Sequence, residues 1–384
     1  MRICIVSDQT FPAWGGEGVA TQNLCRKLSQ RGHYILLLTS NVPHPPEVEG
    51  IDIVRFPSFF IPRKGYFSIT FFPKIISILK NKNIQIIHVN LPTFLGWQAL
   101  LAARHLDIPK VAGFHVQVGN VIPFSSFCFS LLSKLLEIWF SYFYRSFNLL
   151  ISPSNLGKII LSRYCPGKVE VVSNGVDLSI FNLSVVSSQE GKRFRDKFNL
   201  GRKSFLLYVG RLSREKNVGY LLQIIRSLKK KNVKVKLVVV GDGELRNSLK
   251  EKSCAAGLDD TVIFTGFLPD KELLCAYKEA DIFILPSFYE LQSIVVLEAM
   301  AMGNAILVGD SNQNAARELV KEGENGYLFS LEDPEDAAEK IKLILFSDKL
   351  RKSFQETSFR LAKEHDIEKS ISKIEKFYHQ LLTS

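Results

Sequence analysis

The chain has 384 residues, which exceeds the size of one ordinary hydrophobic core and indicates two domains of roughly 180 residues each. Hydrophobic residues make up 46% of the chain and charged residues 23%, a balance that excludes a mainly disordered protein. The net charge is +11, and residues 1–180 hold most of the excess, with 17 Lys and Arg against 9 Asp and Glu.

Short apolar runs alternate with amphipathic segments along the first half of the chain. Continuous apolar runs are typical of parallel strands that are buried on both faces, and the segments between them have the periodicity of helices. At Ser152-Pro153, Ser is a candidate cap and Pro a candidate first residue of a helix. We expect strands at 2–7, 34–39, 51–56, 85–89, 111–114, 149–151 and 169–172, and helices at 17–31, 73–80, 94–105 and 153–164.

The same pattern restarts after a polar segment without apolar periodicity, residues 183–200, which we interpret as an interdomain linker. We expect strands at 205–209, 235–240, 262–264, 282–285 and 305–308, with helices at 218–230, 244–256, 334–346 and 349–382, the last with a break near His365. The predicted fold is α/β, with one Rossmann-like domain at 1–182 and a second at 201–365 facing it across a central cleft. The final helix, about 366–384, is a candidate to pack back on the first domain.

Two cations follow a buried strand in the second half. Arg211 and Lys216 lie where we expect a helix to open, although positive charge is unfavourable at that end of a helix. A bound dianion would neutralise both, and a diphosphate matches the paired donors of Arg and the point charge of Lys. A solvated basic loop is the alternative interpretation.

Two carboxylates lie eight residues apart in the segment PSFYELQSIVVLEAMAMG, which starts at Pro286. Glu298 falls in a helix that is otherwise almost entirely apolar, so its carboxylate needs hydrogen-bond donors, and ribose hydroxyls would serve. Glu290 lies in the preceding loop, within reach of sugar hydroxyls. Backbone N–H groups near residues 292–294, which include Ser293 and Ile294, would face the diphosphate.

Glycines mark two further loops that follow strands. Gly15 and Gly16 precede the first helix, where a backbone free of side chains can approach an anion or simply turn. Gly241-Asp242-Gly243 lacks the spacing of a dinucleotide fingerprint, so we interpret it mainly as a tight turn that caps a helix.

Taken in order, these residues resemble the retaining GT-B glycosyltransferases of family 4, and the resemblance covers nearly the whole chain. The matching segments are Gly15-Gly16, Gln85-Ile86-Ile87-His88, Phe114-His115, Asn174-Gly175-Val176-Asp177, Gly210-Arg211 with Glu215-Lys216, Gly241-Asp242-Gly243, Glu290 with Glu298, and Asn325-Gly326.

The resemblance implies a role for each matching position. Arg211 and Lys216 correspond to the pair that binds the donor diphosphate and supports the departing nucleotide. Glu298 corresponds to the ribose ligand, and Glu290 to the contact with the 3- and 4-hydroxyls of the donor sugar. His115 corresponds to the residue beside the transferred sugar. The remaining donor-binding positions are Gly15, Gly16, Gly210, Ser293, Ile294 and the nucleobase shelf Gly266-Phe267-Leu268.

The implied reaction is transfer of a hexose from a nucleotide-sugar by front-face substitution, without a metal or another cofactor. The leaving phosphate takes the acceptor's proton while Arg211 and Lys216 stabilise its charge. Ser293 stands where the family usually has glycine, which would impair the site if the position required positive φ or a close approach of the phosphate. His115 and His88 have structural alternatives, and Asn174 and Asp177 are expected to fix a turn.

The acceptor is expected to bind the basic first half. Residues 57–67 and 124–147 interleave aromatic side chains with cations, a pattern typical of segments at an anionic membrane surface, or of core and one packed helix. Glu290-Leu291-Gln292-Ser293 is similar to the corresponding segment of diacylglycerol glucosyltransferases and sulfolipid synthases. A lipid acceptor such as diacylglycerol is therefore favoured, ahead of a glycan of cell-surface polysaccharide or lipopolysaccharide assembly and of a soluble sugar.

Other classes remain as alternatives. One is a non-catalytic module that binds nucleotide-sugar or membrane. Nucleic acid is not an expected partner, because the chain lacks a recognised nucleic-acid motif and its cations are scattered.

The six cysteines form no CxxC motif or zinc spacing, so we expect small buried thiols and no metal site. The N-terminal apolar run is too short for a signal peptide and no run suits a membrane span, which favours a cytoplasmic protein, with peripheral binding to the inner face of the membrane as an addition.

Overall fold

The computed structural model describes residues 1–13, 15–61, 65–118, 129–165, 167 and 169–383, and the side chains of 129–131 are outside this description. The chain divides into two compact units. Unit 1 contains Met1–Asn174 and Glu368–Ser384, and unit 2 contains Gly175–Ile367. Both units are α/β, as predicted, and each is described by itself.

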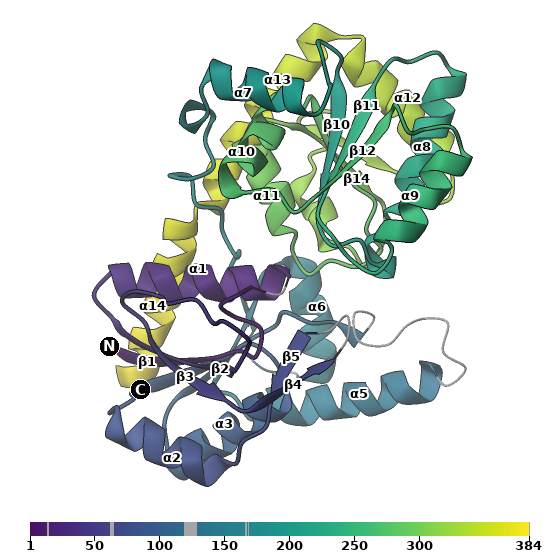
Figure 1. The fold of residues 1–384 in the computed structure, drawn as a ribbon. Helices are drawn as coiled ribbons and strands as arrows, with labels where there is room; N and C mark the ends of the chain where they lie inside the picture. The colour runs from purple at the N-terminus through teal and green to yellow at the C-terminus, as the bar shows by residue number, and fades with distance from the viewer. Residues whose placement is uncertain (14, 62–64, 119–128, 166, 168, 384) are drawn as a thin grey trace. The chain divides into compact units, whose positions relative to one another are not determined.

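Unit 1 is built on a seven-stranded parallel sheet with the order β3-β2-β1-β6-β7-β8-β9. Its central strands are apolar and almost wholly buried, whereas the edge strands β3 and β9 are partly exposed. Figure 1 shows α1 and α14 on one face of the sheet and α3 and α5 on the other. The strands are β1 (Arg2–Val6), β2 (Tyr34–Ser40), β3 (Asp52–Phe56), β6 (Ile86–Val89), β7 (Lys110–Gly113), β8 (Leu149–Ser152) and β9 (Val169–Val171). The helices are α1 (Gly16–Gln30), α2 (Phe72–Asn81), α3 (Phe94–His105), α5 (Phe129–Tyr144), α6 (Asn155–Tyr164) and α14 (Ile367–Thr383).

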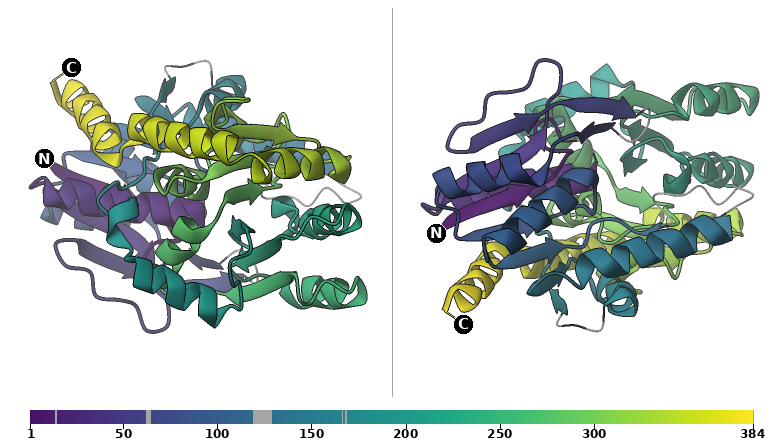
Figure 2. Two further views of the ribbon diagram at one scale, coloured as in Figure 1. Left: turned by 90° about the horizontal axis from the view of Figure 1, so that it is seen from above. Right: turned by 90° about the horizontal axis from the view of Figure 1, so that it is seen from below.

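Unit 2 repeats the plan with a six-stranded parallel sheet in the order β12-β11-β10-β13-β14-β15. Figures 1 and 2 show α8, α9 and α12 on one face of this sheet and α10, α11 and α13 on the other. The strands are β10 (Phe205–Val209), β11 (Lys236–Val240), β12 (Val262–Gly266), β13 (Ile282–Leu285), β14 (Ala305–Gly309) and β15 (Gly326–Phe329). The helices are α7 (Ser188–Lys197), α8 (Gly219–Lys230), α9 (Arg246–Ala255), α10 (Asp270–Glu279), α11 (Ile294–Ala301), α12 (Pro334–Leu345) and α13 (Asp348–Ala362), with short 3-10 helices η1 (Leu183–Val185), η2 (Arg214–Lys216), η3 (Ala315–Leu319) and η4 (Lys363–His365).

The segment 183–200, expected to be a linker, lies inside unit 2 and contains η1 and α7. Ser187 and Glu190 form a capping box that starts α7, and this local signal was overlooked because the helix is mostly polar. Arg195 of α7 then binds Glu279 of α10 with an N–O distance of 2.5 Å. The chain instead passes between the units at Asn174-Gly175 and Ile367-Glu368, and α14 belongs to unit 1 from Glu368 onwards.

Local details correct three smaller expectations. Ser152 ends β8, and the residue that caps α6 is Ser154, whose Oγ accepts from Gly157 N at 3.0 Å. A two-stranded antiparallel hairpin, β4 (Ser58–Ile61) and β5 (Gly65–Ser68), was not expected. Cys254 is exposed rather than buried, whereas Cys128 lies outside the described residues.

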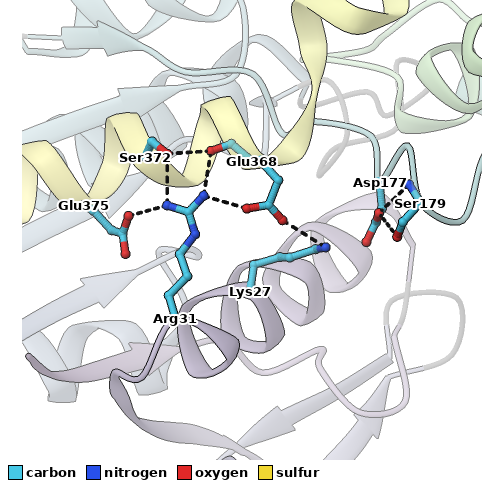
Figure 3. Close-up of polar contacts among 7 residues, drawn as sticks. All are labelled: Lys27, Arg31, Asp177, Ser179, Glu368, Ser372 and Glu375. Atoms are coloured by element: carbon cyan, nitrogen blue, oxygen red, sulfur yellow. Dashed lines mark hydrogen bonds and ion pairs between the residues drawn. The ribbon is translucent and has the colours of Figure 1, made fainter.

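Helix α14 returns to unit 1 and is held there by ion pairs with α1 (Figure 3). Arg31 lies 2.6 Å from a carboxylate oxygen of Glu368 and 2.5 Å from one of Glu375, and Lys27 lies 3.1 Å from the other oxygen of Glu368. Tyr378, fully buried, bonds to His88 Nδ1 on β6, which gives that histidine a structural partner. Asp177 in unit 2 fixes a turn as expected, because its Oδ1 accepts from Ser179 N and Oγ (Figure 3).

None of the helices in the described part of the chain is long and apolar enough to cross a bilayer.

Candidate active site

Three loops of unit 2 carry the residues singled out for donor binding. They follow β10, β12 and β13 at the carboxyl edge of the sheet, where ligands of open parallel sheets bind. Phe288 N donates to Glu215 O at 2.9 Å and so ties the loop after β13 to the loop after β10. The sheet therefore brings the predicted cations and carboxylates to one edge of unit 2.

Lys216 and Glu290 form an ion pair. Lys216 ends η2, and its Nζ lies 2.6 Å from Glu290 Oε1. Glu290 is 8% exposed, and its backbone is fixed on both sides, since its N–H donates to Gln313 O and its carbonyl accepts from Ala315 N. The structure thus places together two side chains that are 74 positions apart in sequence.

Arg211 makes a separate ion pair with Glu215, whose Oε1 lies 2.9 Å from Arg211 Nη2 and also accepts from Ser213 Oγ at 2.7 Å. Arg211 and Lys216 each have a carboxylate partner, so the expectation that only a bound dianion would neutralise them was wrong. The Arg211 side chain is 41% exposed, so N–H donors remain for a ligand. A bound anion would have to replace Glu215 as the partner of Arg211 and Glu290 as the partner of Lys216.

Two glycines shape the loop that carries Arg211. A Cβ on Gly241 (φ 124°) would lie 2.1 Å from the carbonyl oxygen of Gly210, so only glycine allows this approach. Leu212 N donates to Asp242 O at 2.9 Å, which joins the two loops further. Gly241-Asp242-Gly243 therefore supports the Arg211 loop, and the helix cap expected there is absent, since no side chain caps α9.

Glu298 lies on α11 and accepts a hydrogen bond from Tyr277 Oη of α10 at 2.7 Å. Burial raises the pKa of Glu298 to about 7, and the Tyr277 hydrogen bond opposes this rise only in part. The carboxylate thus has a partner within the chain, which the sequence did not reveal because Tyr277 belongs to a helix we had not predicted. At neutral pH both protonation states of Glu298 are present.

The other positions of unit 2 that were predicted to bind the donor differ in their backbone conformation and exposure. Ser293 precedes α11 with φ −95° and ψ 106°, so the backbone conformation at this position does not require glycine. Ile294 is the first residue of the helix. Gly266 (φ 74°) ends β12, and its carbonyl accepts from Gly241 N at 2.9 Å, next to the Arg211 loop. Phe267 is 80% exposed and Leu268 is partly buried.

The other predicted residues belong to unit 1. Gly15 (φ 86°) precedes α1, and a Cβ on Gly16 would meet no atom within 4 Å, whereas Trp14 lies outside the described residues. His115 follows β7, and burial lowers its pKa to about 4, so its ring is neutral at neutral pH. The sequence did not single out Glu17, Thr21 and Asn90, which form a buried polar group beside it.

Two family descriptions match the chain. Residues 14–180 match Glycosyltransferase Family 4, and residues 190–360 match Glycosyl transferases group 1. The boundary between the two matches falls close to the division of the chain into its units.

Curated relatives include proteins of glycolipid synthesis and mannosyl transfer. The alpha-monoglucosyldiacylglycerol synthase of Streptococcus pneumoniae is 31% identical over 313 residues, 80% of this chain and 70% of that protein. Sulfoquinovosyl transferase SQD2 of Arabidopsis thaliana is 27% identical, over 92% of this chain and 68% of its own length. A GDP-mannose-dependent alpha-mannosyltransferase of Mycolicibacterium smegmatis is also 27% identical, over 86% of this chain and 85% of its own.

Solved structures share the fold at low identity. Sucrose-phosphate synthase of Thermosynechococcus elongatus has a TM-score of 0.82 at 19% identity, over 100% of this chain and 99% of that one. Anabaena Alr3699/HepE in complex with UDP-glucose has a TM-score of 0.80 at 17% identity, over 99% and 100%. The chain is 31% identical to a curated relative over 80% of its own length and 70% of the relative's. It therefore belongs to glycosyltransferase family 4 and is a glycosyltransferase of the GT-B fold.

Proposed function

We propose that the protein transfers a hexosyl residue, with retention of configuration, from a nucleotide diphosphate sugar to a lipid acceptor such as diacylglycerol. The observation that carries the donor part is the Lys216–Glu290 ion pair beside Arg211, at the carboxyl edge of the unit 2 sheet. The names of the relatives support the acceptor part, because one is a monoglucosyldiacylglycerol synthase and another a sulfoquinovosyl transferase.

The ion pairs give a physical account of donor binding. The diphosphate replaces Glu290 as the partner of Lys216 and uses the exposed N–H donors of Arg211. Glu290, released from Lys216, accepts hydrogen bonds from sugar hydroxyls, and Glu298 accepts them from the ribose. In the transition state the two cations stabilise the charge that develops on the leaving phosphate, which also takes the proton of the acceptor hydroxyl.

This assignment predicts the effect of Lys216→Ala and Glu290→Ala. Loss of a cation aimed at the leaving group lowers kcat/KM by about 100-fold or more, and loss of the sugar contact lowers it similarly. Radiolabelled transfer from UDP-glucose to diacylglycerol, together with UDP-glucose hydrolysis, measures both. The matched control is Lys231→Ala, which removes a cation from surface ion pairs with Glu335 and Glu339 in the same unit. Unchanged rates in both site variants would refute the site.

The identity of the donor is tested by a screen of UDP-, GDP- and ADP-sugars that follows the melting temperature, since ligands of the folded state raise it. We expect UDP-glucose to give the largest shift. The GDP-mannose-dependent relatives supply the competing outcome, in which GDP-mannose stabilises the protein and UDP-glucose does not.

The two cations supply the charge that a metal would otherwise provide at the diphosphate, so we propose that transfer needs no metal. Addition of excess EDTA is expected to leave the rate of transfer unchanged within about two-fold, well below the loss that follows removal of a catalytic charge. A loss of activity that Mg²⁺ or Mn²⁺ restores would contradict this.

An exposed apolar surface of unit 1 supports a membrane-bound acceptor. We call it the apolar edge, and it consists of Phe71, Phe94, Leu135, Ile138, Trp139 and Tyr142, all at least 44% exposed. The members come from three elements that touch: the rings of Phe71 and Phe94 are 6.1 Å apart, and Trp139 Nε1 donates to Pro92 O just before α3. A cluster of exposed apolar side chains from neighbouring elements is typical of a surface that meets a partner or a membrane.

The same helix α5 buries Phe140, Phe143 and Tyr144 in the core of unit 1, so one face of the helix belongs to the core and the other is exposed. Phe59 and Phe60 of the hairpin are each 48% exposed. Of the two segments predicted to meet a membrane, Pro62, Arg63, Lys64 and residues 124–128 lie outside the described residues.

Flotation with phosphatidylglycerol vesicles tests membrane binding. The double variant Trp139→Ala and Tyr142→Ala is expected to reduce the bound fraction at least about three-fold, because interfacial aromatic residues contribute much of such binding. The control is Phe346→Ala, which removes a 72% exposed aromatic side chain from unit 2. Failure of the unaltered protein to float with these vesicles would remove the membrane proposal and leave the donor site untouched.

A further inference from the structure

The centre of the unit 1 sheet carries a second group of polar side chains. From β1 the chain runs to β2 on one side, whereas β6 and the strands after it lie on the other, so β1 and β6 flank the point at which the strand order reverses. Ligands of open parallel sheets bind outside the carboxyl ends of the strands at this point. Asn90 directly follows β6, and α1 starts in the connection from β1.

Three side chains here form a hydrogen-bonded chain. Asn90 Nδ2 donates to Thr21 Oγ1 at 2.6 Å, and Thr21 Oγ1 donates to Glu17 Oε1 at 2.8 Å. These hydrogen bonds use Oε1 of the Glu17 carboxylate and Nδ2 of the Asn90 amide, so the second polar atom of each side chain remains. Glu17 Oε2 and Asn90 Oδ1 are both buried, and neither has a hydrogen-bond partner within the described part of the chain.

Asn90 is only 1% exposed, so its unpaired carbonyl oxygen is costly unless a ligand supplies a donor. The oxygen faces Gly113, since a Cβ on that residue would lie 2.5 Å from Asn90 Oδ1. The same Cβ would lie 2.8 Å from His115 Nε2. Glycine at 113 therefore lets the Asn90 amide and the neutral His115 ring pack directly against the same stretch of β7 backbone.

The chemistry of the group selects its ligand. Glu17 Oε2 and Asn90 Oδ1 are acceptors, the His115 ring nitrogen either accepts or donates, and none of the residues in the group is Lys or Arg. Such a set suits several hydroxyl groups and repels phosphate. Burial raises the pKa of Glu17 to about 7, and the neighbouring Asp8 carboxylate adds to the rise, while the side chains of Thr21, Ser7 and Asn90 oppose it. Further hydrogen-bond donors would therefore stabilise the ionised carboxylate.

Asp8 shows what a purely structural carboxylate looks like in the same region. It is 2% exposed, and its Oδ1 accepts from Ser40 Oγ at 2.9 Å and from Ser68 N at 2.8 Å, while Oδ2 accepts from Thr93 Oγ1. Both of its oxygens have hydrogen-bond partners, whereas Oε1 of Glu17 has one and Oε2 has none within the described residues. Two buried carboxylates close together therefore differ in whether the protein itself satisfies them.

We infer that Glu17 and Asn90, with His115, form a hydroxyl-binding site of unit 1 that positions a hydroxyl-bearing substrate for glycosyl transfer. The hydroxyls come either from the acceptor or from the hexose of the donor, and the inference rests on the proposed function for the reaction that it serves. Glu17 and Asn90 bind substrate in this assignment, and Thr21 orients both of them.

Two variants test the site by different means. Glu17→Gln keeps the shape and the contact to Thr21 but removes the charge. Gly113→Ala places a Cβ 2.5 Å from Asn90 Oδ1 and 2.8 Å from His115 Nε2, so it displaces both side chains without changing any charge. Each is measured for KM of diacylglycerol in phosphatidylglycerol vesicles, for affinity for UDP-glucose, and for affinity for UDP alone. The loss of hydrogen bonds to a charged or buried group predicts a change of about ten-fold or more.

A rise in the KM of diacylglycerol, with both affinities unchanged, assigns the hydroxyls to the acceptor. A weaker affinity for UDP-glucose, with UDP affinity unchanged, assigns them to the donor hexose. If the KM of diacylglycerol and the affinity for UDP-glucose are unaltered in both variants, the inference is overturned. If the unaltered protein binds no nucleotide-sugar, the proposed function fails instead, which is a separate result.

Asp8→Asn is the matched control for general damage, because it also neutralises a buried carboxyl group in the same unit. It is expected to lower the melting temperature and to leave the KM of diacylglycerol and the UDP-glucose affinity within about two-fold of the original. An equal effect of Asp8→Asn and Glu17→Gln on these quantities would overturn the inference, since the site would then be only a stability feature.

Discussion

Tyr277 and Glu298 show how one hydrogen bond links a buried carboxylate to pH. Burial raises the pKa of Glu298 from 4.5 to about 7. Between these values the folded protein holds a proton that the unfolded chain has released, so the free energy of unfolding falls as the pH rises from 4.5 to 7. We expect Glu298→Gln to reduce this slope in denaturant titrations at pH 5, 6, 7 and 8.

The same residue predicts a pH dependence of donor binding. Ribose hydroxyls donate to the ionised carboxylate, so affinity for UDP should increase as the pH rises through about 7. Isothermal titration between pH 6 and 8 measures the change. In Glu298→Gln the affinity should be weaker and nearly constant over this range, and an unaltered pH profile would show that another group is responsible.

Gly241 tests the support of the Arg211 loop. Alanine there would place Cβ 2.1 Å from the Gly210 carbonyl oxygen and require positive φ, which together cost about 2–3 kcal/mol of stability. The affinity for UDP should fall as well, because Arg211 moves with Gly210. Gly257→Ala is the control, since Gly257 also has positive φ but a Cβ there meets no atom within 4 Å. Equal losses in the two variants would contradict the close-approach argument.

At the scale of elements, α14 depends on charge as well as on apolar contacts. Arg31 bonds to Glu368 and Glu375, and these pairs are only partly exposed to solvent. A double-mutant cycle of Arg31→Ala with Glu375→Ala should give a coupling free energy of about 1 kcal/mol, smaller in 1 M NaCl. A coupling indistinguishable from zero at low salt would mean that the Arg31–Glu375 pair contributes nothing to holding the helix.

Elements with a strong apolar pattern could be predicted from the sequence, and those without it could not. The strands β1, β10 and β11 lie where the continuous apolar runs indicate them. Helix α7 was missed because only two of its residues are buried, and its start depends on a cap rather than on periodicity. The hairpin β4–β5 was missed because its aromatic residues suggested a surface segment, although Phe59 and Phe67 pair across it.

Candidate site residues were predictable where they follow a strand, and their partners were not. Arg211 and Glu290 follow β10 and β13, so the topology alone brings them to one edge of the sheet. Their ion-pair partners depend on side-chain directions that a sequence does not contain. Asn90 follows a strand in the same way, and the rule that located Arg211 could have located it.

At the scale of the whole molecule, each unit has its own sheet and its own group of polar residues. Hydrogen–deuterium exchange can therefore locate the nucleotide. UDP should slow exchange in segments 210–217 and 288–298, and it should leave β2 and β3 unchanged. Protection of residues 15–19 would support the assignment of Gly15 and Gly16 to the donor, and exchange there at the original rate would remove it.

The division of the chain also has a consequence for how the protein is made. Unit 2 is one uninterrupted segment, Gly175–Ile367, whereas unit 1 joins Met1–Asn174 to Glu368–Ser384. On the ribosome, where domains fold as they emerge, unit 2 can complete its core while unit 1 still lacks the helix that covers His88 with Tyr378. The part synthesised first is thus the part finished last, and in the interval its nascent sheet must be shielded from aggregation.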